Sequence, residues 1–190
     1  LTIGTPTLVG VIGADTVSLV TTGATGAFTN KNVGTAKTVN ISGLTLGGAD
    51  AGNYTLTQPT RTADITAKPI TVTADAGQTK VFGAADPTFT YSTSEPLFSG
   101  DSFTGTLNRA VGENAGSYAI GLGTLSAGSN YGLTFVSNNF TITAKPITVT
   151  ANAGQTKVFG AADPTFAYTS SDPGATFTGA LDRATGENVG

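Results

Sequence analysis

Residues 65–91 read ITAKPITVTADAGQTKVFGAADPTFTY, and residues 142–168 read ITAKPITVTANAGQTKVFGAADPTFAY. The two stretches are 77 residues apart and differ only at Asp75/Asn152 and Thr90/Ala167. Each contains a run in which apolar residues alternate with threonine, a pattern typical of a β-strand with one buried face. A near-identical copy at this spacing predicts an array of small β modules.

The repeat extends outward from this stretch on both sides. FTGTLNRAVGENAG from Phe103 matches FTGALDRATGENVG from Phe177 at an offset of 74, so the intervening loop is three residues shorter in the later copy. Upstream, NVG at 32–34 resembles NAG at 114–116. We therefore predict three units, of which we expect the first to begin upstream and the last to continue downstream: a divergent β module at 1–67, a complete module at 68–144 and the start of another at 145–190.

The composition favours strands throughout. By count the chain has 36 threonines and 26 glycines, and no window carries a sustained helical stripe. The sequence predicts an all-β fold of tandem small Ig-like β-sandwich modules in an elongated array, with β-grasp-like modules as the alternative. The expected strands lie at 16–20, 37–41, 70–74, 103–107, 118–120, 131–135 and 140–142.

The module junctions can be located from the phase of the strands. Before Lys68 and Pro69 the apolar residues are odd-numbered, whereas after them they are even-numbered, and the phase slips again at Lys145 and Pro146. Because strand side chains alternate between faces, each slip marks a change of strand. Proline lacks the amide donor and holds its predecessor extended, so we expect a stiff linker of one or two residues.

The composition also excludes several kinds of chemistry. The chain has no histidine and no cysteine, which removes imidazole bases, thiolate nucleophiles and the usual zinc ligands. The formal net charge is −3, and no basic stripe or long apolar run is present. We expect no nucleic-acid partner, no membrane insertion and no enzymatic activity.

Two Asp-Pro pairs lie in identical GAADPTF segments, at Asp86-Pro87 and Asp163-Pro164. The favoured interpretation is a β-turn in which aspartate caps local amides and proline fixes φ. The alternative is calcium binding, with Asp75 or Glu113 supplying further oxygen ligands, although no EF-hand spacing supports it.

The segments GENAG and GENVG place Glu113-Asn114 and Glu187-Asn188 between glycines, which predicts loops. A catalytic pair of carboxylates would need a second acid held nearby in a pocket. We assign no catalytic, cofactor-binding or metal-ligating residue, and we expect no cofactor.

Two further residue types have a structural and a functional interpretation. Tyr54 and Tyr131 follow asparagine at expected strand starts, where we expect core anchors with a hydrated hydroxyl; stacking on a sugar ring is the alternative. Lys68 and Lys145 are expected in solvent. An intramolecular Lys–Asn isopeptide bond would instead require burial beside a carboxylate.

Residues 68–144 closely resemble the MBG-type repeat, named for mucin binding, at GQTKVFGAADPTF, R-A-x-G-E-N-x-G and S-x-N-Y-x-L-x-F. Phe82 and Phe159 stand where that pattern usually has tyrosine. Residues from about Asp15 to Ile65 look like the companion YDG repeat, although its Tyr-Asp-Gly is absent. Together the resemblances imply a filamentous-haemagglutinin-like adhesin, secreted to the bacterial cell surface.

The expected function is therefore a non-catalytic stalk that extends a binding region from the cell, with neighbouring repeats as its partners. The alternative is that each repeat itself binds mucin-type or matrix glycans, or calcium. The last unit lacks the later strands of the complete module. We accordingly expect Val149, Phe159 and Phe166 to be more exposed than Val72, Phe82 and Phe89.

Overall fold

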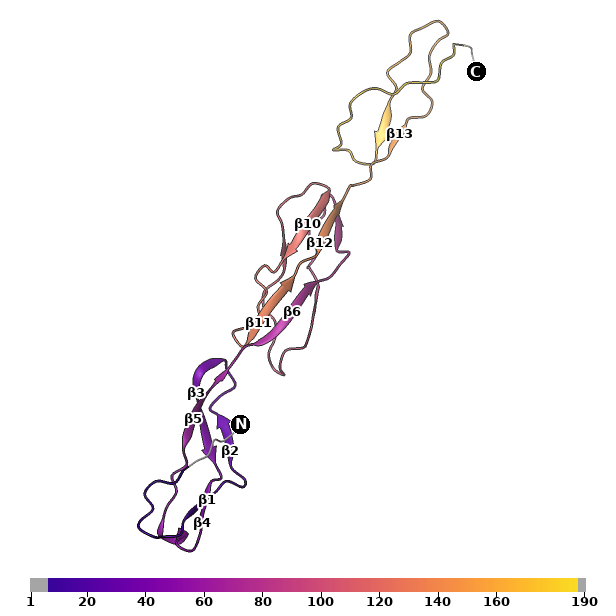
Figure 1. Ribbon diagram of the computed structural model, residues 1–190. Coiled ribbons are helices and arrows are strands. Elements are labelled where there is room, and N and C mark those ends of the chain that lie inside the picture. The colour runs from indigo at the N-terminus through magenta and orange to yellow at the C-terminus, as the bar shows by residue number, and fades with distance from the viewer. Residues whose placement is uncertain (1–6, 188–190) are drawn as a thin grey trace.

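The computed structural model describes residues 7–187. Figure 1 shows three bodies that follow one another end to end along the chain. No strand of one body pairs with a strand of another among the described residues, so each sheet is built within a single body. Within residues 7–187 no helix has the length and apolarity needed to cross a membrane.

The first body contains two small sheets. β3 pairs with β2 and β5, and β1 pairs with β4, all antiparallel. Val39, Ile41 and Leu44 are buried in it. Its elements are β1 (Ser18–Val20), β2 (Thr25–Phe28), β3 (Gly34–Ser42), β4 (Thr45–Gly47), a 3-10 helix η1 (Ala51–Asn53) and β5 (Thr60–Ile65).

The middle body is a sandwich of two sheets. One sheet has the order β11-β6-β8 and the other β7-β12-β10-β9. Its strands are β6 (Lys68–Ala74), β7 (Thr79–Val81), β8 (Tyr91–Thr93), β9 (Asn108–Arg109), β10 (Gly116–Gly121), β11 (Tyr131–Val136) and β12 (Asn139–Thr143).

The chain passes from one sheet to the other twice, from β6 to β7 and from β11 to β12, and these two crossings lie next to each other. β6 runs parallel to β11 in the first sheet, and their continuations β7 and β12 are parallel in the second sheet. Strands that switch sheets through a bend form the corners of such sandwiches. The two sheets of this body form an all-β sandwich, so the prediction of an all-β fold built from small sandwich modules is confirmed. The described residues contain no α-helix, which disfavours a β-grasp sheet wrapped around one.

The core lies between the two sheets of the middle body. Ile70, Val72 and Ala74 from β6 pack with Ile120 from β10 and with Phe140 and Ile142 from β12. Burial in β6 follows the alternation seen in the sequence: Ile70, Val72 and Ala74 are buried, whereas Thr71 and Thr73 between them are only partly covered.

Two residues, 66 and 67, separate β5 from β6. The strand phase changes across them, because Ala63 and Ile65 face inward in β5 while Ile70 faces inward in β6. A short linker with a change of phase is therefore confirmed. The strand expected at 103–107 is wrong: this segment makes an isolated bridge between Thr104 and Ser126.

The third body has two strands among its described residues, β13 (Val149–Ala151) and β14 (Tyr168–Ser170), and these pair antiparallel. Val149 is 40% exposed, whereas its counterpart Val72 is 0% exposed. Phe159 is likewise more exposed than Phe82, while Phe166 and Phe89 are both partly buried. The prediction of greater exposure in the third body is therefore confirmed for Val149 and Phe159. It is not confirmed for Phe166.

Candidate functional site

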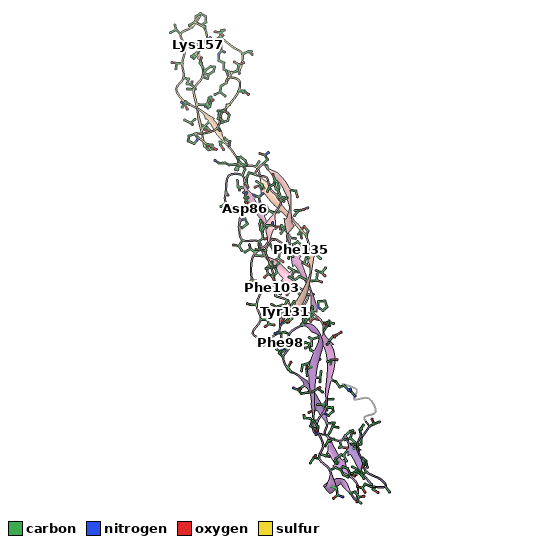
Figure 2. All side chains as sticks on the ribbon, turned by 90° about the vertical axis from the view of Figure 1, so that its left-hand side faces the viewer. Asp86, Phe98, Phe103, Tyr131, Phe135 and Lys157 are labelled. Carbon is green, nitrogen blue, oxygen red and sulfur yellow. The ribbon has the colours of Figure 1, made fainter. Side chains whose placement is uncertain are left out.

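Four charged side chains meet at the end of the middle body that faces the third body, where Figure 2 labels Asp86. Lys80 Nζ lies 2.6 Å from Asp86 Oδ1 and 2.5 Å from Glu113 Oε2. Arg109 Nε lies 2.7 Å from Asp86 Oδ2, and Arg109 Nη2 pairs with Glu113 Oε1. Two cations and two anions thus alternate in a closed ring, which we call the charge quartet.

The sandwich itself positions the two cations. Lys80 lies in β7 and Arg109 in β9, and their side chains are only 5% and 6% exposed. The Arg109 guanidinium lies 5.2 Å from the Tyr118 ring centroid and 5.5 Å from that of Phe140, within cation–π range. It therefore forms the polar edge of the apolar core.

The two anions come from loops. Asp86 follows the turn after β7, and Glu113 lies in the loop between β9 and β10. Arg109 also donates hydrogen bonds to the backbone carbonyls of Ala110 and Gly112. The quartet therefore ties two distal loops to the ends of two core strands.

The ion pairs keep all four groups charged. Hydrogen bonds from Arg109, and then from Lys80, lower the pKa of the Asp86 carboxyl from its ordinary 3.8 to about 2. Lys80 and Arg109 likewise lower the pKa of Glu113, and the two carboxylates raise the pKa of Lys80. A carboxyl group that is ionised near neutral pH has no proton to donate as a general acid.

The third body repeats the arrangement with the same residue types. Lys157 Nζ lies 2.7 Å from both Asp163 Oδ1 and Glu187 Oε2, and Arg183 pairs with the same two carboxylates. Here the Lys157 and Arg183 side chains are 20% and 29% exposed, because the strands that cover the first quartet have no counterpart in the described third body.

The structure corrects the turn interpretation of Asp86. The turn falls earlier, where the Ala84 amide bonds the Val81 carbonyl, and the hydrogen bonds of the Asp86 side chain go to Arg109 rather than to local amides. Asp163 makes the matching contacts in the third body. The prediction that Glu113 and Glu187 lie in loops is confirmed, while Asn188 lies outside the described residues.

Sequence reasoning missed Lys80 and Arg109. Both recur in the next copy, as Lys157 and Arg183, at the offsets of the segments that contain them. In a chain with only 11% charged residues, the repetition of two cations with two acids was an available signal.

The quartet also bears on the two chemical alternatives. It brings Glu113 near a second acid, Asp86, as a carboxylate pair would require, but each acid is neutralised by the same two cations. No cluster of three or more potential metal-ligating His, Cys, Asp or Glu residues occurs in the described part of the chain. A cation at Asp86 would have to displace Lys80 and Arg109.

Tyr54 and Tyr131, the two predicted core anchors, make equivalent hydrogen bonds through their hydroxyl groups. The Tyr131 hydroxyl donates to Asp101 Oδ2 (2.7 Å) and accepts from the Phe98 amide (2.8 Å). The Tyr54 hydroxyl donates to Asp15 Oδ2 (2.6 Å) and accepts from the Ile12 amide (3.0 Å). Both rings are partly buried, as expected, but each hydroxyl holds a loop rather than only water.

Lys68 and Lys145 are exposed, as predicted, and each has a carboxylate partner 27 residues later. Lys68 Nζ lies 2.9 Å from Glu95 Oε2, and Lys145 Nζ lies 2.6 Å from Asp172 Oδ2. Neither arrangement places the amine beside an asparagine in a buried site, so the geometry does not favour an isopeptide bond.

Comparison with protein families finds two kinds of domain in the chain. The MBG domain (YGX type) matches residues 70–141 and 147–190, and the YDG domain matches residues 2–63. The MBG matches together span more than half of the chain, so the chain belongs to the MBG domain (YGX type) family. No curated protein and no solved structure matches it.

Proposed function

We propose that this chain is a non-catalytic stalk segment of a large secreted bacterial cell-surface adhesin, and that its modules hold a binding region away from the cell. One observation carries the proposal. In the middle body the chain enters through β6 at the end facing the first body and leaves through β12 at the end facing the third (Figure 1). Repeating such a module adds length without adding width.

Two further observations support the stalk. YDG and MBG domains occur here in tandem, as repeat-type domains. The charged groups that come together in the quartet neutralise one another and are tied to loops and core strands, so they stiffen the module. Neighbouring repeats of the same chain are its partners in this role, and its location is extracellular.

Small-angle X-ray scattering tests the proposal on the chain and on versions lengthened by whole 77-residue repeats. The maximum dimension is expected to rise in proportion to the number of repeats. A dimension that levels off as repeats are added would mean that the modules fold back on one another, and the stalk would be excluded.

A glycan-binding repeat is the second candidate. Phe82 and Phe159 occupy matched positions and are 47% and 70% exposed, so each copy presents an aromatic ring to solvent. Titration of the chain with mucin-type oligosaccharides distinguishes the two functions. Binding with a stoichiometry that follows the number of repeats, and that is lost in Phe82→Ala with Phe159→Ala, supports a binding repeat.

A further inference from the structure

The loop at residues 31–33 of the first body contacts the near end of the middle body, close to the label of Phe98 in Figure 2. We call this end of the middle body, which faces the first body, its base. Lys31 Nζ lies 3.0 Å from Asp101 Oδ1. The Val33 amide donates to Asn130 Oδ1 at 2.9 Å, and Asn130 Nδ2 lies 3.3 Å from Asn32 Oδ1. Three consecutive residues of one body thus each find a polar partner on the next.

An aromatic ring supports the same contact. Lys31 Nζ lies 5.2 Å from the Phe98 ring centroid, in cation–π geometry. A cavity of about 200 Å³ lies between the two bodies, and Val33 and Ile65 from the first line it together with Phe98 and Tyr131 from the second.

Contacts within the middle body itself hold its docking residues in place. Asp101 is fixed by the Tyr131 hydroxyl through its other oxygen, and the Phe98 amide donates to that same hydroxyl. Tyr131 in turn packs against the core. Its hydroxyl, and then Lys31, lower the pKa of Asp101, so this carboxylate is charged at neutral pH.

The equivalent loop of the middle body carries the opposite charge. Gly34 begins β3 opposite Ile65, and Gly116 begins β10 opposite Ile142, so residues 31–33 and 113–115 occupy matched places. Glu113 therefore stands where the first body has Lys31. It also turns back into the charge quartet of its own module.

The segment of the third body that corresponds to residues 97–102 has no counterpart of Phe98 or Asp101. Six residues, 97–102, separate Pro96 from Phe103, whereas three residues, 174–176, separate Pro173 from Phe177. The shorter segment reads Gly-Ala-Thr and contains neither an aromatic ring nor a carboxylate. Among the described residues, no hydrogen bond or ion pair joins residues up to 143 to residues from 145 onward.

We infer that Phe98, Asp101 and Asn130 form a docking surface specific for a preceding module with a Lys-Asn-Val loop, which makes the first junction a fixed joint. At the second junction Glu113 stands in place of the lysine, and residues 174–176 supply neither the aromatic ring nor the carboxylate, so this joint is not formed there. This goes beyond the stalk role, because it assigns an order in which the two kinds of module fit together.

The absence of native cysteine allows a direct test by pulsed electron spin resonance on the full chain. Spin labels are attached at Thr38→Cys in the first body and Ser92→Cys in the middle body, both at exposed positions. The expected result is a single narrow distance distribution. Lys31→Glu, which copies the residue of the middle module, is expected to broaden and shift it, and Phe98→Ala to broaden it.

Lys145→Ala is the matched control for Lys31→Ala, because it removes an exposed lysine whose ion pair with Asp172 lies away from the first junction. It should leave the narrow distribution intact, whereas Lys31→Ala should broaden it. A broad distribution in the unmodified chain, no change with Lys31→Glu, or equal broadening with Lys145→Ala would each overturn the inference. Lys31 is 58% exposed, so its replacement leaves the folding of either module unaffected.

Discussion

Arg109 and Arg183 occupy the same place in two copies of one motif, yet their side chains are 6% and 29% exposed. The contacts of the two guanidinium groups with aspartate and glutamate are alike, so the difference lies in what surrounds them. A covered ion pair is screened less by water and salt than an open one. Breaking the covered quartet also leaves a buried cation without its partner, which is the costly case.

A prediction for Asp86→Asn follows from its lowered pKa. The folded-state pKa of about 2 lies below the ordinary 3.8, so the unfolded chain binds the proton more readily between these values. The stabilisation from this group is present above about pH 4 and is lost as the pH falls toward 2. Melting temperature measured by circular dichroism from pH 7 to pH 2 should therefore fall less steeply in Asp86→Asn, from a lower starting value at pH 7.

Asp163→Asn is the matched control, since it removes the same residue from the open quartet of the third body. It should change the melting temperature and its acid dependence less than Asp86→Asn does. Equal effects at the two positions would show that burial does not govern the strength of the quartet.

At the scale of elements, the sequence predicted strands well where one strand carried a long alternating run. The runs at 37–41 and 70–74 lie within β3 and β6, whose buried residues are those the alternation selects. The run at 103–107 failed, because Gly105 has φ = +76° and the segment meets Ser126 in an isolated bridge only. The parallel pairing of β6 with β11 was also unpredictable, since alternation fixes which face is buried but not the neighbouring strand.

The charge quartet escaped prediction for a related reason. Asp86 was interpreted through its neighbours in the chain, as a turn residue, whereas its partner Arg109 is 23 residues away. Contacts of this kind depend on the sheet order β7-β12-β10-β9, in which two strands separate the strand of Lys80 from that of Arg109. Local sequence rules could place Glu113 in a loop, but they could not place that loop beside Lys80.

A close approach of two backbone segments makes a prediction at this scale. A Cβ at Gly105 would lie 2.1 Å from the Thr124 carbonyl oxygen, in addition to the strain of positive φ. Gly105→Ala should therefore lower the unfolding free energy by about 2–4 kcal/mol, as measured by urea denaturation. Gly83→Ala is the control: its φ is +85° and no atom lies within 4 Å of the added Cβ, so only the strain of about 1–2 kcal/mol should appear. Similar losses for both would assign the effect to φ alone.

For the whole molecule, the two MBG-type repeats form an internal comparison, because nearly the same residues are covered in one body and open in the other. Hydrogen exchange followed by mass spectrometry measures how well the backbone amides of equivalent peptides in the two bodies are protected. Amides of residues 147–151 should exchange faster than those of residues 70–74, since β6 is paired on both sides and β13 on one.

The same experiment tests whether the third body stays open in solution. Its apolar residues Ile147, Val149 and Phe177 are each more than a third exposed, and an uncovered strand edge invites pairing with another chain. Rapid exchange at 147–151 at every protein concentration would mean that the face remains uncovered. Protection that rises with concentration, toward the level of residues 70–74, would instead mean that copies of the chain cover one another there. Since the two peptides differ in covering strands and hardly in sequence, the difference in their exchange rates measures the stabilisation that the later strands of the module supply.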